Sequence, residues 1–305
     1  MEPFRVHILG CGSALPTLQH YSSSQIVEIR GKEFMIDCGE GTQIQLRRSR
    51  QHFSKIGSIF ISHCHGDHCL GLIGMLSTFG MTGRTAPINV YAPVEFENIF
   101  RANLDFFCSN MDFDVIFHAV DTTKNKVIYE DKSLTVETIP LKHRVPCCGF
   151  LFREKPTLPH IRRDMIDFYG ISISQINNIK NGMDWTTSEG DVIPNERLTF
   201  PADPPRSYAY CSDTKYMPAL HKLIKGVNLL YHESTYANDY ADRAKMYYHS
   251  TAGQAATVAR DAEVKKLLLG HYSARYNDEN LLLKEAREIF PDSMLSQENM
   301  VFDIE

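Results

Sequence analysis

Short apolar runs rich in isoleucine, valine and phenylalanine alternate along the chain with segments in which apolar residues recur at helical spacing. The short runs predict strands at residues 4–9, 24–30, 33–38, 58–62, 88–92, 114–119, 134–141, 149–152, 208–211, 228–231 and 265–269. The helical spacing predicts helices at residues 42–50, 69–81, 217–225, 236–245 and 252–262. Because no internal repeat accompanies this alternation, it indicates one layered α/β unit.

Residues 155–205 interrupt the alternation. The tract holds several proline, asparagine and glycine residues, one helical pattern at residues 161–169, and the only tryptophan, Trp185. A long irregular stretch inside a compact domain indicates an insertion with a role of its own. We therefore expect a single domain over residues 1–305 with an inserted arm at residues 155–201. Acidic and basic residues are mixed along the arm, so a solvated helical hairpin without a binding role is the alternative.

The composition is that of an ordinary folded protein, since 43% of the 305 residues are hydrophobic and 23% are charged. The formal net charge of −5 would repel a polyanion in general, so any contact with nucleic acid must be local. The apolar runs are far shorter than the roughly 20 residues that cross a bilayer, and the N-terminus lacks a secretory signal pattern. Eight cysteines without a CxxC spacing fit reduced thiols. We expect a cytoplasmic protein with no membrane segment.

Candidate chemistry begins directly after the strand at residues 58–62, where residues 63–68 read His-Cys-His-Gly-Asp-His. In an extended segment, residues two apart point the same way, so His63 and His65 can bind one metal ion. Gly66 allows a turn, after which Asp67 and His68 can hold a second ion close to the first. The alternative is a solvated loop in which the histidines bind nothing, but metal-ligand spacing of this kind is rare by chance.

Two ions need more ligands than this loop provides. His143, Asp213 and His271 each follow a predicted strand, at residues 134–141, 208–211 and 265–269 respectively. Taken singly, each is more often a loop or capping residue than a ligand. Taken together, they complete a site for two metal ions.

At this point the sequence resembles the ribonuclease Z family of the metallo-β-lactamase superfamily, which trims the 3′ trailer from precursor tRNA. The resemblance covers nearly the whole chain. The His63–His68 loop marks only the superfamily. More specific are the runs at residues 37–43 (Asp-Cys-Gly-Glu-Gly-Thr-Gln), 212–214 (Ser-Asp-Thr), 232–235 (His-Glu-Ser-Thr), 249–251 (His-Ser-Thr) and 271–276 (His-Tyr-Ser-Ala-Arg-Tyr).

The resemblance implies an α/β fold of the four-layer αββα type, with a dinuclear metal site at one edge. One ion would be held by His63, His65 and His143, and the other by Asp67, His68 and His271, while Asp213 would bridge the two. The family usually uses zinc, so two Zn²⁺ per subunit are expected, although a site built from nitrogen and oxygen ligands could also take Mn²⁺ or Fe²⁺. The resemblance also implies precursor tRNA as the substrate and a homodimer as the assembly.

Two residues are expected to move protons during cleavage, and a third is expected to orient one of them. The family uses Asp67 as the proton acceptor for the attacking water. We expect His249 to protonate the departing ribose oxygen, with Glu233 orienting it and raising its pKa. In the alternative interpretation, Glu233 caps a helix that begins near Thr235, and His249 precedes an N-cap at Ser250. Arg275 would support the metal site or touch a phosphate, and a buried ion pair is its alternative.

The sequence departs from the family after the first strand. Bacterial members commonly carry a Pro-x-Lys-x-Arg-Asn segment there, which is associated with the tRNA 3′ end and with discrimination against a finished CCA. Residues 16–21 read Pro-Thr-Leu-Gln-His-Tyr, without the basic pair. The arm lies where the family carries a tRNA-binding exosite, in which Arg162 and Arg163 would contact phosphates.

Two other functions share parts of these features. A phosphodiesterase of the same superfamily, acting on cyclic nucleotides or other small esters, would have the metal site but need no arm. An RNA-binding protein with a vestigial metal site would be expected to have lost at least one ligand.

Overall fold

The computed structural model describes residues 2–305. The chain forms two compact units, one made of Glu2–Arg153 together with Arg206–Glu305, and the other of Glu154–Pro205. All seven predicted metal ligands belong to the larger unit. The predicted arm at residues 155–201 lies inside the smaller one.

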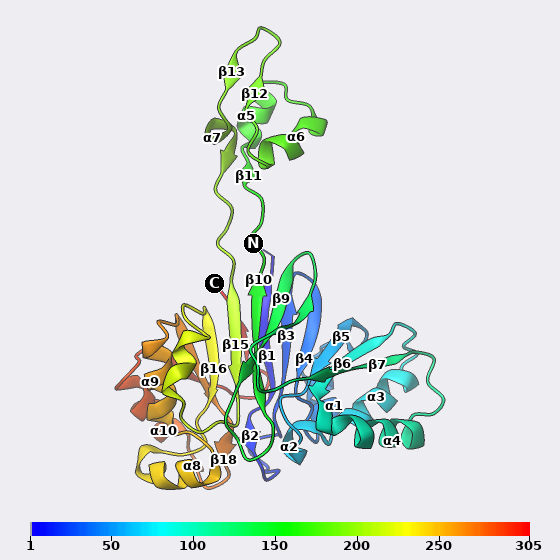
Figure 1. Ribbon diagram of the computed structural model, residues 1–305, viewed down its shortest axis with the longest axis vertical. Coiled ribbons are helices and arrows are strands. Elements are labelled where there is room, and N and C mark those ends of the chain that lie inside the picture. Colours follow the sequence, from blue (N-terminus) through cyan, green and yellow to red (C-terminus); the bar gives the residue numbers. More distant parts are fainter. Residues whose placement is uncertain (1) are drawn as a thin grey trace. The chain divides into compact units, whose positions relative to one another are not determined.

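Two seven-stranded sheets form the centre of the larger unit (Figure 1). The first has the order β20-β1-β3-β4-β5-β6-β7 and the second the order β19-β17-β16-β15-β10-β9-β8. The strands of the first are β1 (Phe4–Gly10), β3 (Ser24–Ile29), β4 (Lys32–Ile36), β5 (Ile56–Phe60), β6 (Ile88–Pro93), β7 (Val115–Val120) and β20 (Val301–Asp303). Those of the second are β8 (Val127–Glu130), β9 (Leu134–Pro140), β10 (Cys148–Glu154), β15 (Ser207–Cys211), β16 (Leu229–Glu233), β17 (Lys266–Gly270) and β19 (Ser293–Leu295). Two-residue strands β2 (Gly12–Ser13) and β18 (Tyr272–Ser273) pair separately.

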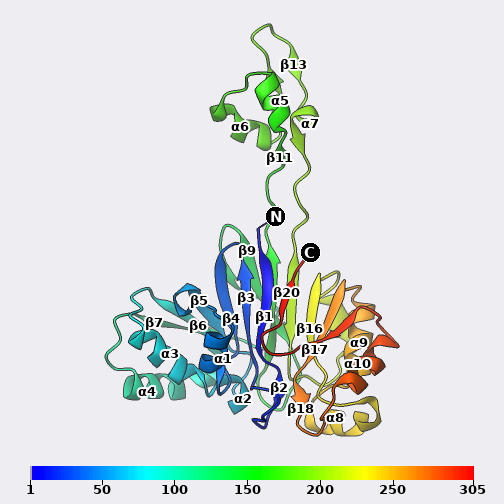
Figure 2. The same ribbon diagram turned by 180° about the vertical axis from the view of Figure 1, so that it is seen from behind.

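Helices cover the outer face of each sheet (Figures 1 and 2). The first sheet carries α1 (Thr42–Arg48), α3 (Leu72–Met81) and α4 (Glu97–Phe107), and the second carries α9 (Ala252–Asp261) and α10 (Asn280–Arg287). The remaining helical segments of this unit are α2 (Gly66–Cys69), α8 (Ala241–Tyr247), η1 (Phe53–Lys55), η2 (Val94–Phe96), η3 (Pro218–Lys222) and η4 (Asn238–Tyr240). The four-layer αββα sandwich expected from the sequence is confirmed.

The first sheet is apolar on both faces because both faces are buried. In β4, Phe34 and Ile36 join the core between the sheets, whereas Met35 packs with the helices on the outer side. In β5, Phe60 faces inward and Ile59 outward. Successive side chains of a strand point to opposite faces, so a strand between two layers needs an unbroken apolar run.

Several predicted elements differ in detail. The helix predicted at residues 69–81 is interrupted between α2 and α3, because the Gly71 N–H donates to the Cys38 carbonyl oxygen at 2.9 Å instead of making an intrahelical bond. Only glycine fits there, since a Cβ atom would come within 2.1 Å of the Gly39 carbonyl oxygen. The helix predicted at residues 217–225 is only the 3₁₀ segment η3. The helix predicted at residues 236–245 consists of η4 followed by α8. Helices α4 and α10 were not predicted.

The smaller unit has its own elements and its own apolar cluster. It contains β11 (His160–Ile161), β12 (Trp185–Thr186), β13 (Val192–Ile193), β14 (Thr199–Phe200), α5 (Arg163–Phe168), α6 (Ile173–Lys180) and α7 (Asn195–Leu198). The cluster is formed by Ile166, Ile171, Ile179, Ile193 and Leu198. Of its helices, only α5 matches the sequence expectation. Within residues 2–305, no helix has both the length and the apolar content needed to cross a bilayer.

Candidate metal centre

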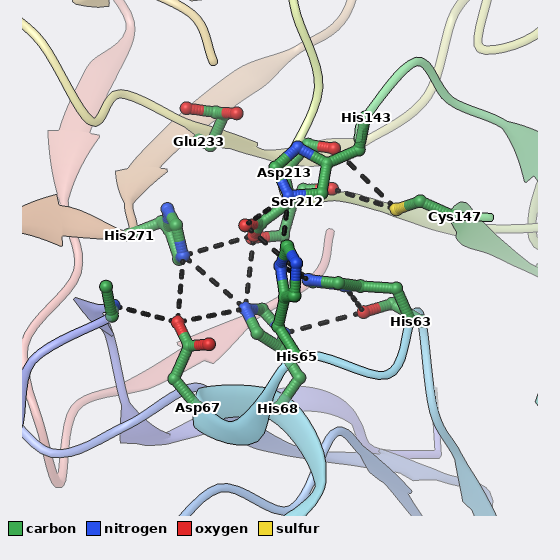
Figure 3. A network of polar contacts seen from close by, with 12 residues as sticks. His63, His65, Asp67, His68, His143, Cys147, Ser212, Asp213, Glu233 and His271 are labelled. Carbon is green, nitrogen blue, oxygen red and sulfur yellow. Dashed lines mark hydrogen bonds and ion pairs between the residues drawn. The ribbon is translucent and has the colours of Figure 1, made fainter. Parts of the chain in front are cut away.

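Four of the predicted ligands converge in a first group, which we call group A: His63, His65, His143 and Asp213. The Nδ1 atom of His65 lies 3.1 Å from the Nε2 atom of His63 and 3.1 Å from the Nε2 atom of His143. The Oδ2 atom of Asp213 lies 3.7 Å from each of those two Nε2 atoms. The loop after β5, the loop after β9 and the end of β15 therefore meet at one point (Figure 3).

A second group lies beside the first and consists of Asp67, His68 and His271. We call it group B. The Nε2 atoms of His68 and His271 are 3.4 Å apart, and the Oδ2 atom of Asp67 lies 3.5 and 3.6 Å from them. The Oδ1 atom of Asp213 is 3.1 Å from both Nε2 atoms. Asp213 thus directs one oxygen to each group, which is the arrangement a bridging carboxylate requires.

Outer hydrogen bonds fix the proton on the far nitrogen of each group B histidine. The Nδ1 atom of His68 donates to Asp37 Oδ2 at 2.7 Å, and the Nδ1 atom of His271 donates to Thr235 Oγ1 at 2.9 Å. The Thr235 hydroxyl in turn donates to Glu233. In the neutral rings, the Nε2 lone pairs consequently face each other across 3.4 Å. Such an arrangement is repulsive unless a cation lies between them, so the donor set fits a metal ion.

Outer hydrogen bonds also fix the ring protons of two histidines in group A. The Nδ1 atom of His143 donates to the carbonyl oxygen of Tyr248 at 3.0 Å. The Nδ1 atom of His63 donates to Ser62 Oγ at 3.0 Å, since that hydroxyl uses its own proton for Asp37. Both Nε2 lone pairs therefore point at His65 Nδ1. Three imidazoles and a carboxylate form a ligand set that zinc, manganese and iron accept.

The electrostatics of the cluster also favour bound cations. Burial lowers the pKa of His63, His65 and His143, which keeps these rings neutral and able to act as ligands. Burial opposes a charge on His68 as well, but the carboxylates of Asp213, Asp67 and Asp37 raise its pKa well above the usual value. A proton on His68 partly neutralises the negative charge of these three carboxylates, as a bound metal ion would.

The carboxylate of Glu233 is fully buried and accepts four hydrogen bonds. Its donors are the backbone N–H groups of Thr214 at 2.6 Å and Ser250 at 3.0 Å, the Thr235 hydroxyl at 2.6 Å, and His249 Nδ1 at 3.0 Å. Burial lowers the pKa of His249, but the charge and hydrogen bond of Glu233 outweigh it and raise the value to about 9. At neutral pH, His249 is therefore an imidazolium ion.

His249 lies at the edge of the metal-ligand cluster. Its ring centroid is 5.4 Å from that of His271 and 5.1 Å from that of His143. Because Nδ1 is held by Glu233, the second ring proton sits on the opposite nitrogen. All nine residues predicted for the site are brought together at one edge of the sandwich: His63, His65, Asp67, His68, His143, Asp213, Glu233, His249 and His271.

The structure contradicts three of the alternative interpretations given in the sequence analysis. His63 and His68 are buried, so the loop is not a solvated one. The N-cap of α9 is Thr251, which forms a capping box with Gln254, so the alternative with an N-cap at Ser250 is wrong. Arg275 is exposed and its guanidinium lies over the rings of Tyr236 and Tyr240 at 5.3 and 4.7 Å from their centroids, so the alternative of a buried ion pair is wrong as well.

Sequence reasoning missed the residues that orient the ligands. Asp37, Ser62 and Thr235 fix ring protons, and the backbone N–H of Ala14 donates to Asp67 Oδ2 at 2.8 Å. Asp37 follows β4 with a φ of 55°, an unusual conformation for a residue other than glycine. A carboxylate directly after an apolar strand was the available signal.

Residues 16–21, which depart from the family pattern, are held in place by contacts of His20 with two glutamates, which we call the His20 clasp. The His20 ring lies between two carboxylates, with Nδ1 3.0 Å from Glu298 Oε2 and Nε2 3.1 Å from Glu279 Oε1. Burial lowers the pKa of His20, but the two glutamates reverse the effect and raise it overall. Leu18 is fully exposed. Residues 16–21 therefore have no lysine or arginine, and their one histidine is held by glutamates, so none of their side chains is free to bind a phosphate as a cation.

Comparisons with known proteins agree with this geometry. Residues 4–160 match the family described as anti-Pycsar protein Apyc1. Ribonuclease Z of Bacteroides fragilis is 55% identical over 304 residues, with 100% of both chains covered, and ribonuclease Z of Bacteroides thetaiotaomicron is 56% identical over 304 residues, covering 100% of this chain and 96% of the relative. The crystal structure of the short form of human tRNase Z has a TM-score of 0.73 and 25% identity, with 99% of each chain covered.

These similarities extend over the whole chain, whereas the Apyc1 match covers about half of it. The chain belongs to the ribonuclease Z family of metallo-β-lactamase-fold proteins.

Proposed function

We propose that this protein is a zinc-dependent endoribonuclease that removes the 3′ trailer of precursor tRNA. Group A would hold one ion through His63, His65 and His143, and group B would hold the other through Asp67, His68 and His271, with Asp213 shared. The observation that carries the proposal is the convergence of ring nitrogens in both groups at 3.1–3.4 Å, with Asp213 directing one oxygen to each group.

When bound, two divalent ions lower the pKa of a water molecule and stabilise negative charge on the phosphate. The protein must then receive the proton of the attacking water. Asp67 is suited to this step, because Ala14 N–H holds its Oδ2 atom and leaves Oδ1 for the water. The surrounding imidazoles outweigh the effect of burial and lower the pKa of Asp67, so its carboxylate is ionised before attack.

Cleavage of the P–O3′ bond leaves an alkoxide on the ribose that must gain a proton. His249 is the donor in this proposal, since it borders both groups and the charge of Glu233 raises its pKa. Glu233 holds it in place and keeps it charged, while the two backbone donors keep Glu233 itself fixed. The products are a tRNA with a 3′-hydroxyl and a trailer with a 5′-phosphate.

The remaining parts of the proposal concern the setting of the enzyme. The Glu154–Pro205 unit serves as the tRNA exosite, two chains form a homodimer, and the protein works in the cytoplasm. Eight free cysteines among residues 2–305 support a reducing compartment. In the arm, Arg163 is exposed, whereas Arg162 contacts Asp164 and stacks on Phe200, so Arg163 is the better candidate for a phosphate contact.

A cleavage assay on metal-reconstituted protein tests the function. Precursor tRNA, CCA-ended tRNA, a 3′,5′-cyclic nucleotide and a chromogenic phosphodiester are compared after loading with Zn²⁺ or Mn²⁺. We expect cleavage of the precursor at the start of its trailer to be by far the most efficient reaction. Faster turnover of the cyclic nucleotide would indicate a small-molecule phosphodiesterase, and binding of precursor without cleavage would indicate an RNA-binding protein.

A further inference from the structure

A cavity of about 370 Å³ opens beside the metal-ligand cluster on the side of Asp67 and His65. We call it the loop-side cavity, because Ala14 and Pro16 form one wall. Its volume lies in the range of sites that bind small ligands. His249 is not among its lining residues and borders a separate cavity with Lys215 and Lys245.

The lining of the loop-side cavity combines apolar surface with one strong cation. Pro16 is exposed and Leu70 is 70% exposed, so both offer apolar surface to a ligand. Arg144 is the one lysine or arginine among the residues that line it. An apolar wall beside a single guanidinium matches the chemistry of a nucleotide, which joins a flat base to an anionic phosphate.

Arg144 is positioned but not neutralised. It follows the predicted ligand His143, whose Nδ1 atom is bonded to the Tyr248 carbonyl, and its own guanidinium lies 5.8 Å from the centre of the Tyr247 ring. His143 and Arg144 therefore contact Tyr248 and Tyr247, respectively, which are also consecutive residues. Within residues 2–305, no carboxylate oxygen lies within 4.0 Å of the Arg144 guanidinium, so its charge is available for an anion.

No other residue that lines the loop-side cavity is a lysine or arginine that could bind an anion. The segment of Ala14 and Pro16 has no lysine or arginine, and the His20 ring is held by two glutamates. Glu40 is exposed and lines the same cavity, so its carboxylate opposes an anion nearby.

The direction of the RNA follows from the proposed proton donor, so this step rests on the proposed function. His249 marks the position of the departing O3′ atom, and the tRNA 3′ nucleoside must lie on that side. The trailer continues from the other side of the scissile phosphate. We infer that the loop-side cavity holds the first trailer nucleotide, and that Arg144 binds the phosphate that follows this nucleotide.

Two precursor substrates test the inference. The first carries a trailer of several nucleotides, and the second carries a trailer of a single nucleotide with a free 3′-hydroxyl. The second substrate lacks the phosphate assigned to Arg144 and is otherwise the same at the scissile bond. Steady-state cleavage of both is measured with wild type, Arg144→Ala and Arg144→Lys, together with metal content and thermal stability.

For Arg144→Ala, we expect kcat/KM on the long trailer to fall about 10-fold to 100-fold, as for loss of a charge-assisted hydrogen bond. On the single-nucleotide trailer, the variant should match wild type. Arg144→Lys should retain part of the activity, because it keeps the charge but not the fork of donors. The slope of log kcat/KM against log salt on the long trailer should become shallower by about 0.7 in Arg144→Ala.

Arg101→Ala is the matched control, because Arg101 is also exposed and lies 5.8 Å from an aromatic ring, that of Phe117, but does not line the cavity. It should behave as wild type on both substrates. Equal losses of Arg144→Ala on the two trailers, or no loss on either, would overturn the inference. Failure of the wild-type enzyme to cleave either precursor would instead contradict the proposed function.

Discussion

The Nδ1 atom of His68 lies 2.7 Å from the Oδ2 atom of Asp37, and both side chains are fully buried. This carboxylate also accepts hydrogen bonds from the Ser62 hydroxyl and the Tyr210 hydroxyl. It therefore fixes the ring of a proposed ligand from outside the metal groups. Asp37→Asn should weaken metal binding by about 10-fold to 100-fold, because an amide holds the ring proton less strongly than a carboxylate. Competition with a chromogenic chelator measures the change.

Asp131→Asn serves as the control for this substitution, since Asp131 stabilises a surface turn through Ser133 and Tyr129. Its metal affinity should equal that of wild type. An Asp37→Asn protein that keeps wild-type affinity for both ions would show that the outer hydrogen bond does not tune the ligand.

His249→Ala should lower kcat on precursor tRNA by about 10²-fold to 10⁴-fold, the usual contribution of a positioned general acid. Both metal ions should remain bound, because His249 is not one of the seven proposed ligands. Elemental analysis and single-turnover kinetics together separate the two effects. His221→Ala, which removes a ring bonded to the Pro218 carbonyl, is the control and should keep full activity. Loss of one ion in His249→Ala would assign the residue to metal binding instead.

Glu33 should make the stability of the fold depend on pH. Its side chain is 4% exposed, and burial raises its pKa from the ordinary 4.5 to about 7, with Lys55 Nζ 3.9 Å away. Between these values the folded state keeps the proton that the unfolded state releases, so stability falls as pH rises from about 4.5 to about 7. Glu33→Gln should remove this component and raise the Tm above that of wild type by about 2–4 °C at alkaline pH.

Thermal melts of both proteins across this pH range provide the measurement. Most other carboxyl groups titrate alike in the two proteins, so the difference between the curves isolates Glu33. Curves that run parallel from acid to alkaline pH would mean that Glu33 does not titrate differently in the folded state.

Replacing residues 155–201 by a short linker should separate RNA binding from chemistry. The seven proposed ligands and the two large apolar clusters belong to the larger unit, so the deletion leaves them in place. Cleavage of precursor tRNA should fall about 10-fold or more, as when one of two binding regions is lost. Hydrolysis of a chromogenic phosphodiester should be unchanged. Losses of the same size on both substrates would contradict an exosite in the arm.

Most of the sandwich could be predicted because its strands are buried between two layers. Unbroken apolar runs such as that of β5 are hard to mistake, and ligands that directly follow parallel strands meet at one edge of a sheet. Helix α4 escaped prediction because Phe106 and Phe107 remain exposed and blur the polar face of its pattern. The break at Gly71 could not be foreseen, since it depends on contact with the loop at Gly39.

The outer partners of the ligands could not be predicted for a related reason. Asp37 and His68 are separated by 31 residues, and Thr235 and His271 by 36, so no local spacing records their contact. The His20 clasp likewise joins residues more than 250 positions apart. The ligand types carry a recognisable local pattern, whereas the hydrogen bonds that orient them exist only once the sheets have packed.

Asp213 and the two groups around it connect segments that follow strands of opposite sheets. The loop of His63, His65, Asp67 and His68 extends from the first sheet, whereas His143, Asp213 and His271 extend from the second. Each ion of the proposed pair would consequently act as a cross-link between the halves of the sandwich. Ligands that bind only the folded state add to its stability in proportion to the logarithm of their concentration. Zinc supply would then govern how long the molecule survives as well as how fast it works.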